Sequence, residues 1–362
     1  MNQVSAVSRK VERGERIADD DALILYREAD LLLLGNLARK RAAVFHPHDM
    51  VTFIIDRNIN YTNVCISRCR FCAFYRDATN PEAYVLSHDE ILKKVGEAVS
   101  LGATQIMLQG GLHPALDMDY FCDLLKEIKA RFRVFIHSFS PPEIFHLATR
   151  SGCSVATVIQ RLYAAGLDSL PGGGAEILSD RVRKIISPRK ISSAQWLEVM
   201  ETAHQAGLKT TATMMIGSIE TPEERIEHLC KVRSLQDQTG GFRAFIPWSY
   251  KASNTELGGS EISSLEYLRT LALARIYLDN IVNIQGSWVT QGPDIGQLTL
   301  YFGANDLGSI MLEENVVKAA GAAYHLTEPE MVALIRTADK IPAQRNTEYT
   351  VIKTYTHSAD RT

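Results

Sequence analysis

The chain has 362 residues, of which 46% are hydrophobic and 22% charged, and its formal net charge is −3 at pH 7. This composition is typical of a globular protein with a sizeable core, and because no long run of Lys and Arg occurs we expect no nucleic-acid partner. The longest apolar run near the start, 31–34, follows charged residues, so we expect neither a signal peptide nor a membrane-spanning helix.

The predicted elements begin with a helical extension at residues 1–50, because 19–44 are rich in Leu, Ala, Arg and Lys. A β-branched run at 51–59 then predicts a first buried strand. After it, short apolar runs alternate with amphipathic stretches. The predicted strands lie at 105–108, 134–137, 166–169, 209–214, 243–246, 281–285 and 298–301, and the predicted helices at 89–101, 120–132, 194–206, 222–238 and 264–280.

The alternation of strands and helices predicts an α/β fold with parallel strands and right-handed crossovers. We therefore predict a full or nearly full (β/α)8 barrel of the TIM type over residues 51–306. Residues 307–362 are predicted to be a C-terminal helical segment packed on the barrel, with two helices within 312–338. In such barrels the functional residues lie on the loops that follow the strands, so unusual residues on these loops are expected to form one site.

Three of the six cysteines, Cys65, Cys69 and Cys72, lie in one short loop with the spacing C-x3-C-x2-C. Thiolates select an iron–sulfur cluster or zinc. A zinc finger would need a fourth ligand nearby, and the next histidine, His88, is too distant; a disulfide would leave one cysteine unpaired. A 4Fe–4S cluster normally takes four ligands, so three cysteines leave one iron open to a small molecule such as S-adenosylmethionine.

The remaining cysteines, Cys122, Cys153 and Cys230, match no ligand spacing, and we expect them to be buried packing residues. Free thiols together with an oxygen-sensitive cluster indicate a reducing, cytoplasmic location.

The pattern C-x3-C-x-aromatic-C, in which Phe71 is the aromatic residue, resembles the signature of the radical SAM superfamily. The resemblance implies that the three cysteines hold a 4Fe–4S cluster and that S-adenosylmethionine binds its open iron, with Phe71 packed against the adenine. It also implies a reducing electron donor such as flavodoxin or ferredoxin. In such enzymes the cofactors perform the difficult step, while the protein binds and orients the substrate.

Glycines follow two of the predicted strands. Gly110 and Gly111 let the backbone approach a ligand closely, and the resemblance assigns their backbone to the methionine amino group; a tight turn is the alternative. The glycines at 172–174 form either an anion-binding surface or a flexible linker. Glu176, directly after them, would present a carboxylate to the cofactor or to substrate hydroxyls.

Polar and aromatic side chains follow the other strands. Ser138 and Ser140 could contact the carboxylate or ribose of the cofactor, and His137 beside them is either a structural group or a catalyst. Trp248 and Trp288 could pack in the core or stack on a planar substrate group. Two carboxylates suit acid–base catalysis or binding of ribose hydroxyls, namely Asp294 and Asp306.

Further motifs at 60–65, 171–177 and 303–306 resemble the group that contains the futalosine-pathway enzymes and the deazaflavin (FO) synthase subunits. Segments 245–249, 284–290 and 305–317 are similar to the cyclic dehypoxanthine futalosine synthases of menaquinone biosynthesis. Ile310 and the turn at 251–253 depart from the usual pattern of this family, which affects only the detail of the substrate. Aminofutalosine synthase and an FO synthase subunit are the alternatives.

This resemblance implies a ring closure within one small-molecule substrate. Hydrogen is taken from the ribose of dehypoxanthine futalosine, and the resulting carbon radical adds to the benzoate ring of the same molecule. Loss of one electron and one proton then restores aromaticity. Glu176, His137 and Asp306 are the candidate proton acceptors, and Arg243 is the candidate partner of the benzoate.

Overall fold

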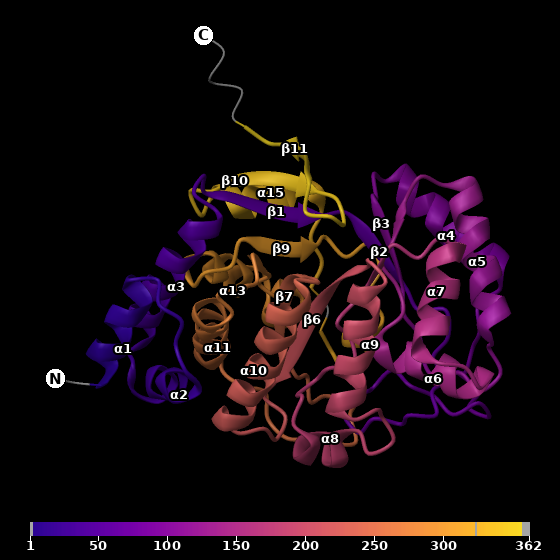
Figure 1. The fold of residues 1–362 in the computed structure, drawn as a ribbon. Helices are drawn as coiled ribbons and strands as arrows, with labels where there is room; N and C mark the ends of the chain where they lie inside the picture. The colour runs from indigo at the N-terminus through magenta and orange to yellow at the C-terminus, as the bar shows by residue number, and fades with distance from the viewer. Residues whose placement is uncertain (1–2, 323, 357–362) are drawn as a thin grey trace, which may run out of the picture.

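Parallel strands at eight positions close into a barrel in the computed structural model, which describes residues 3–322 and 324–356 (Figure 1). The first position is a long strand in two parts, β1 (Met50–Ile54) and β2 (Asp56–Ile59). The other positions are, in chain order, β3 (Gln105–Leu108), β4 (Phe135–Ile136), β5 (Ser169–Leu170), β6 (Lys209–Ile216), β7 (Phe242–Ser249), β8 (Asn283–Ile284) and β9 (Asp306–Ser309).

The pairing of these strands shows that the ring is complete. Strands β2, β3 and β4 form one parallel sheet, and β5, β6, β7 and β8 form another. A parallel bridge between His137 and Ser169 joins the two sheets. A second bridge connects Gln285 to Asp306, and β9 pairs in parallel with β1. The predicted (β/α)8 barrel is therefore confirmed.

Helices surround the ring between successive strands, as the alternation in the sequence predicts. Local capping explains where several begin: Ser87 and Thr221 each form a capping box with the glutamate three residues later. The helices are α4 (His88–Ser100), α5 (Met118–Arg131), α6 (Pro141–Ser151), α7 (Val155–Ala165), α8 (Asp180–Ile186), α9 (Ser193–Gln205), α10 (Pro222–Thr239) and α11 (Ser264–Tyr277).

The N-terminal residues form three helices on one side of the barrel (Figure 1). They are α1 (Gln3–Glu12), α2 (Asp19–Glu28) and α3 (Leu31–Phe45). Helix α3 packs against α11 and α2 packs against α10, so the extension covers the outer helices rather than the strands. Within the described residues, no helix has a stretch long and apolar enough to cross a bilayer.

The prediction of a strand at 298–301 is wrong. These residues end helix α13 (Pro293–Leu298) and form a 3-10 turn, η1 (Thr299–Tyr301), after the short helix α12 (Trp288–Gln291). A short apolar run does not distinguish a buried strand from a buried helical turn. The eighth strand is instead β9, which begins at Asp306, so residues expected on the loop after the last strand lie on the strand itself.

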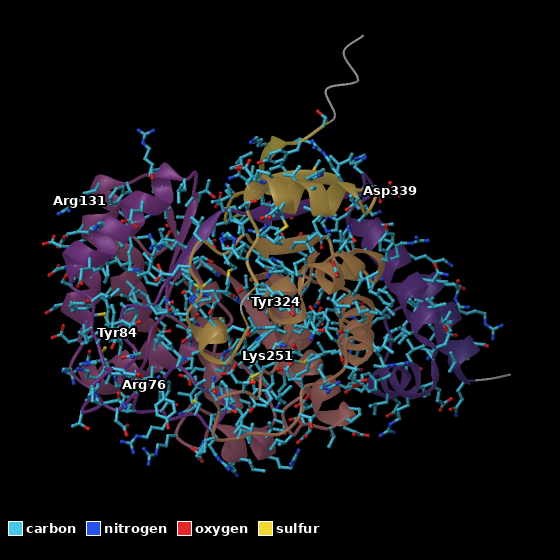
Figure 2. The ribbon with its side chains drawn as sticks, turned by 180° about the vertical axis from the view of Figure 1, so that it is seen from behind. Arg76, Tyr84, Arg131, Lys251, Tyr324 and Asp339 are labelled. Carbon is cyan, nitrogen blue, oxygen red and sulfur yellow. The ribbon has the colours of Figure 1, made fainter. Side chains whose placement is uncertain are left out.

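The C-terminal segment is not purely helical, contrary to the prediction for 307–362. It contains α14 (Val316–Ala319) and α15 (Glu328–Arg336), but also β10 (Ile341–Arg345) and β11 (Val351–Thr354). Strand β10 runs parallel to β1 and β11 pairs antiparallel with β10. These elements lie over one end of the barrel (Figures 1 and 2). The last residues of the segment, 357–362, lie outside the described residues.

Candidate functional site

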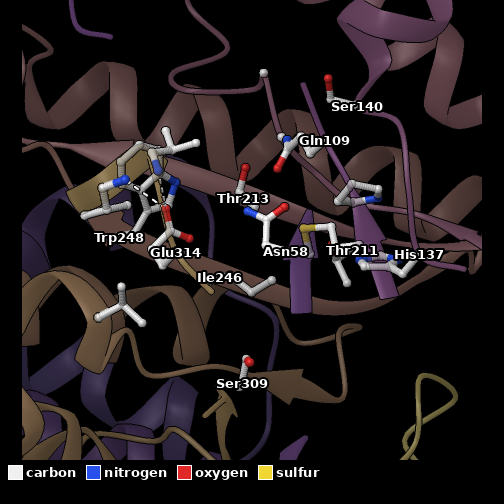
Figure 3. A pocket seen from close by; sticks show the side chains of 18 of the residues that line it. Asn58, Gln109, His137, Ser140, Thr211, Thr213, Ile246, Trp248, Ser309 and Glu314 are labelled. Carbon is white, nitrogen blue, oxygen red and sulfur yellow. Dashed lines mark hydrogen bonds between the residues drawn. The ribbon is translucent and has the colours of Figure 1, made fainter. Parts of the chain in front are cut away.

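A cavity of about 400 Å³ occupies the interior of the barrel, and the cysteine loop forms part of its wall. Figure 3 shows part of this wall from close by. Its wall includes all three clustered cysteines, which follow β2 at the carboxyl ends of the strands. At the other end it reaches Arg243, near the start of β7, and Arg345, at the end of β10. One cavity therefore connects the loop end of the barrel with its opposite end.

The cysteine loop presents three thiols to this cavity. Cys69 is buried, whereas Cys65 and Cys72 are half-buried. The backbone N–H of Leu112 donates to Cys65 Sγ at 3.3 Å, and Ser67 Oγ lies 3.3 Å from Cys69 Sγ. Such hydrogen bonds to sulfur are a means by which proteins tune iron–sulfur clusters.

The donor set fits a cluster better than a single ion. Among the described residues, no three His, Cys, Asp or Glu side chains converge closely enough to hold one metal ion. Three soft thiols on one cavity wall match the corners of an iron–sulfur cluster. Burial raises the pKa of Cys69 and raises that of Cys72 to about 11, so ligation must displace thiol protons. Of the other cysteines, Cys122 is buried and Cys153 and Cys230 are half-buried, and none of them lines the cavity.

The segment that follows the cysteine loop anchors it from outside. The N–H of Cys65 donates to the carbonyl of Arg76 at 3.2 Å, and the N–H of Arg76 donates to the carbonyl of Asn63 at 2.8 Å. Farther along, the hydroxyl of Tyr84 donates to the carbonyl of Asn60 at 3.1 Å. Arg76 and Tyr84 lie on the same side of the molecule in Figure 2. The loop and the residues before it are thus held by hydrogen bonds to their main chain that do not involve the thiols.

Gly110 and Gly111 lie against the cysteine loop, and both line the cavity. A Cβ on Gly111 would come within 2.2 Å of the carbonyl oxygen of Val64, and one on Gly110 within 2.7 Å of the ring of Tyr61. Neither contact is possible for a larger residue, so close approach explains both glycines.

Glu143, which the sequence analysis missed, holds this glycine turn in place. Its fully buried carboxylate accepts hydrogen bonds from Gly110 N–H at 3.2 Å, from Tyr61 Oη at 2.7 Å and from Ser140 N–H at 2.7 Å. Burial raises the pKa of Glu143 despite these donors. The capping-box spacing from Ser140 to Glu143 was the sequence signal that could have revealed it. Ser140 lines the cavity, but its hydroxyl is bonded to Glu143 at 2.5 Å.

Glu176 lies in the cavity wall and forms a buried ion pair with Lys190, a second residue that the sequence analysis missed. Lys190 Nζ is 2.5 Å from Glu176 Oε1 and 5.0 Å from the centre of the Phe71 ring. Burial alone would lower the pKa of Lys190, but Cys69 and Glu176 raise it overall, so the side chain is an ammonium. No spacing rule connects position 190 to the cysteine loop, and only the fold brings the two together.

His137 and Arg243 lie at the opposite end of the cavity. His137 Nδ1 is hydrogen-bonded to Ser169 Oγ at 2.8 Å. Burial, together with Arg243 and Arg345, lowers the pKa of His137 to about 3, so it is neutral and a weak base at neutral pH. Arg243 Nη1 donates to the carbonyl of Thr347 at 3.1 Å.

The two tryptophans both line the cavity but differ in exposure. Trp288 is fully buried, and its Nε1 donates to the carbonyl of Ser309 at 3.1 Å. Trp248, on β7, is half-buried and projects into the cavity (Figure 3). Trp248 is therefore the ring with a free face for a ligand.

Three predicted site residues do not line the cavity. Ser138 is fully buried, and its Oγ accepts from the N–H of Leu108 at 2.8 Å, which is a structural role. Asp294 is exposed on α13. Asp306 is fully buried at the start of β9 and binds Arg345. The assignment of Asp306 to the loop end followed from the misplaced eighth strand.

Comparisons with known proteins agree with the fold. Residues 59–231 match the model of the radical SAM superfamily, and residues 239–358 match the CofH/MqnC C-terminal region. Among solved structures, methylornithine synthase (PylB) is similar with a TM-score of 0.72 and 19% identity, covering 92% of this chain and 95% of that chain. At this identity the likeness shows the fold alone.

Several curated relatives cover most of the chain. The cyclic dehypoxanthine futalosine synthase of Halalkalibacterium halodurans is 45% identical over 97% of this chain and 96% of its own length, and that of Streptomyces coelicolor is 49% identical over 93% and 86%. The 5-amino-6-(D-ribitylamino)uracil–L-tyrosine 4-hydroxyphenyl transferase of Methanopyrus kandleri is 42% identical over 84% and 85%. The chain therefore belongs to the radical SAM superfamily and, within it, to the CofH/MqnC family.

Proposed function

We propose that this protein closes the ring of dehypoxanthine futalosine to give the cyclic product of menaquinone biosynthesis, using a 4Fe–4S cluster and S-adenosylmethionine. The observation that carries this proposal is the identity of 45% and 49%, over nearly the whole chain, to two cyclic dehypoxanthine futalosine synthases. The three thiols on the wall of one deep cavity support it chemically.

The cofactor end of the site is the cysteine loop and its neighbours. Cys65, Cys69 and Cys72 would hold the cluster, which together with S-adenosylmethionine supplies one-electron reduction and hydrogen abstraction. The Lys190 ammonium beside this loop suits the carboxylate of the bound nucleotide. Gly110 lines the cavity, and its backbone carbonyl would accept a hydrogen bond from the amino group of the nucleotide.

The substrate end of the site is the deeper part of the cavity. Arg243 offers a guanidinium for the benzoate carboxylate, and the exposed face of Trp248 suits the aryl ring. Neutral His137 adds no competing positive charge but can donate or accept one hydrogen bond. A cavity of about 400 Å³ with mostly buried walls excludes water and holds sugar and ring close together, which favours ring closure over side reactions.

The direct test is anaerobic incubation of the cluster-loaded protein with dithionite, S-adenosylmethionine and dehypoxanthine futalosine. We expect the cyclised product together with 5′-deoxyadenosine, both detected by mass spectrometry. Cleavage of S-adenosylmethionine without any cyclised product would contradict the assigned substrate while leaving membership of the superfamily intact.

A second candidate function is favoured by the 42% identity to the transferase of Methanopyrus kandleri. A parallel incubation with 5-amino-6-(D-ribitylamino)uracil and L-tyrosine tests it, and a third with the substrate of aminofutalosine synthase completes the comparison. We expect product only with dehypoxanthine futalosine, because the relatives of that name are 45% and 49% identical to this chain, whereas the transferase of Methanopyrus kandleri is 42% identical.

We also propose that the reducing partner is an acidic one-electron carrier protein, such as a flavodoxin or ferredoxin, which docks beside the cysteine loop. The N–H of Arg70 donates to the carbonyl of Ile186 at 2.8 Å, so the end of α8 lies against this loop. Several exposed residues around this junction are basic or apolar, and we call them the basic rim: Ile66, Arg68, Lys184, Ile185 and Arg189. The exposed acids beside them, Asp77 and Glu256, are paired with Arg68 and Arg70. Arg68 is paired with Asp77, whereas Lys184 and Arg189 have no ion-pair partner in the part of the chain that the structure describes. Such a surface complements an acidic partner.

A further inference from the structure

Two polar side chains in the cavity wall have no role in the site as described so far. Asn58 lies on β2, and Glu314 lies between β9 and α14. Both line the cavity, and both are seen at the pocket in Figure 3. Residues far apart in the sequence thus meet where the first and last strands of the barrel are neighbours, and the side chain of Asn58 hydrogen-bonds to Glu314.

Asn58 is left with an unused acceptor. Its side chain is 7% exposed, yet its Oδ1 has no hydrogen-bond partner among the described residues. A buried polar atom without a partner is destabilising, so such atoms are uncommon in folded proteins and call for a ligand or water. This acceptor points to a donor group that binds in the cavity.

Glu314 is held by backbone N–H groups and has no ion-pair partner among the residues that the structure describes. Its Oε1 accepts from the N–H groups of Val316 at 2.7 Å and Val317 at 2.8 Å. Its sequence neighbour Glu313 differs, because it forms ion pairs with Arg57 at 2.6 Å and Lys94 at 2.9 Å. Burial raises the pKa of Glu314, which reflects a carboxylate in an enclosed setting without a compensating positive charge. A carboxylate of this kind is suited to neutral hydrogen-bond donors.

The position of Asn58 along the strand locates this pair between the two ends of the cavity. In the register of β2 with β3, Asn58 faces Met107, one layer above the pair Asp56 and Gln105. The hydroxyl of Thr347 donates to Gln105 at 2.9 Å, so the Asp56 layer forms the deep end of the cavity. Asn58 therefore lies between that deep end and the cysteine loop.

We propose that Asn58 and Glu314 form a sugar-hydroxyl subsite, in which the amide oxygen and the carboxylate bind neighbouring hydroxyl groups of the substrate's ribose. Two adjacent acceptors match the two O–H donors of a vicinal diol, and neither an anionic nor an apolar group would satisfy them. This inference rests on the proposed function. A substrate whose aryl carboxylate binds Arg243 would present its sugar at the level of Asn58, facing the cofactor end of the cavity.

The test is a thermodynamic cycle in which either the side chain of Asn58 or Glu314 is changed or the vicinal hydroxyls of the substrate are removed. Binding of dehypoxanthine futalosine and of an analogue that lacks the vicinal hydroxyls is measured by anaerobic calorimetry, without reductant, for the wild type and for Asn58→Leu and Glu314→Gln. We expect the wild type to bind the analogue roughly tenfold or more weakly, since one hydrogen bond corresponds to about a tenfold change. Each variant should bind the natural substrate about tenfold more weakly but the analogue within about twofold of the wild type.

The same titrations with S-adenosylmethionine distinguish the two riboses that the site could hold. Unchanged affinity for S-adenosylmethionine supports the proposal, whereas a loss confined to it would assign the hydroxyl site to the cofactor and overturn the proposal. Equal losses for the substrate and its analogue would also overturn it. Glu313→Gln is the matched control, with substrate affinity expected to stay within about twofold of the wild type because Glu313 pairs with Arg57 and Lys94.

Two complications can be distinguished from a failure of the proposed subsite. If Asn58→Leu fails to fold, as judged by its circular dichroism and melting temperature, the comparison of the two ligands on the wild type still decides whether the hydroxyls contribute. If the wild type cleaves S-adenosylmethionine but binds no dehypoxanthine futalosine, the proposed function fails and the subsite fails with it. Binding of the substrate without any effect of its hydroxyls overturns the subsite alone.

Discussion

Arg345 and Asp306 form a buried, two-pronged ion pair that joins β10 to β9. Arg345 Nε donates to Asp306 Oδ2 at 2.6 Å and Nη2 donates to Oδ1 at 3.0 Å. Thr52 on β1 donates to Oδ2 of the same carboxylate at 2.6 Å. Asp306 is fully buried and Arg345 is 4% exposed. One carboxylate therefore ties the closing strand, the first strand and the C-terminal strand together.

Replacing Asp306 with Asn is expected to destabilise the protein by about 3–5 kcal/mol, because the guanidinium of Arg345 would remain buried without a counter-charge. The free energy of unfolding in urea is the measurement. Arg13→Met, which breaks the exposed pair with Glu15, is the control and should change stability little. A loss for Asp306→Asn no larger than that of the control would show that the buried pair does not hold the strands together.

Serine in place of any one of Cys65, Cys69 and Cys72 is expected to abolish a stable 4Fe–4S cluster, since a hydroxyl is a poor ligand for a soft iron site. Iron and sulfide content and visible absorption after anaerobic reconstitution measure this. Cys230→Ser is the matched control, because Cys230 is half-buried but does not line the cavity. Full cluster loading in a loop variant would contradict the ligand assignment.

Alanine at Gly111 is expected to disturb the cysteine loop, because its Cβ would come within 2.2 Å of the carbonyl oxygen of Val64. We expect reduced cluster loading and weaker binding of S-adenosylmethionine. Gly96→Ala makes the same chemical change inside α4, where the nearest atoms are 3.5 Å away. That control should be neutral or stabilising by up to about 1 kcal/mol. Normal loading and affinity in Gly111→Ala would show that close packing at this turn is dispensable.

The lowered pKa of His137 predicts that the stability of the protein depends on pH. Its pKa is about 3 in the folded protein, lowered from 6.5 by burial and by Arg243 and Arg345. Between these two values the unfolded chain binds the proton and the folded chain does not, so acid favours unfolding. Stability should fall as the pH drops below 6.5 toward 3, by up to about 1.4 kcal/mol per pH unit from this residue.

The measurement is urea unfolding at a series of pH values for the wild type and His137→Gln. The variant should show a shallower fall, because the amide does not titrate. His48→Gln, at an exposed position, serves as the control for the substitution itself. Parallel curves for the wild type and His137→Gln would mean that other groups account for the acid sensitivity.

If the basic rim is the docking surface, charge reversal there should slow turnover with a protein electron donor but not with a chemical reductant. Lys184→Glu with Arg189→Glu should slow turnover several-fold with reduced flavodoxin or ferredoxin, because like charges would then oppose the acidic partner. Turnover with dithionite should be unchanged, since a small reductant needs no docking surface. Equal rates for the wild type and the double variant with the protein donor would remove the rim from the docking surface.

Much of the fold could be predicted because alternating strands and helices leave a strong local pattern. The strand at 105–108 has the predicted bounds, since Gln105–Leu108 is a short apolar run before a glycine turn. The eighth strand, Asp306–Ser309, could not be recognised, because Asp, Gly and Ser are poor strand formers and only pairing with β1 holds this segment extended. The C-terminal strand β10 was hidden in the same way by Pro342.

The residues of the site also differ in whether the sequence could predict them. The three cysteines and the glycine turn were recognisable because their chemistry depends on spacing within one loop. Lys190 and Glu314 were not, because each reaches the cavity from a segment distant in the sequence, and Glu143 supports the glycine turn from a helix equally distant. The prediction of Asp306 as a site residue was wrong for the opposite reason. A carboxylate at this position suits acid–base chemistry, but whether it reaches the cavity depends on where the last strand begins.

Arg345 and Thr347 are buried at one end of the cavity, whereas the cysteine loop forms the wall at its other end. A substrate that enters at the cysteine loop must reach the deep end before the nucleotide occupies that entrance. The two reactants should therefore enter in a fixed sequence, with the futalosine first, and initial-rate kinetics should follow a compulsory-order pattern. Departure must run in reverse, so the cyclised product would be trapped until methionine and deoxyadenosine have gone.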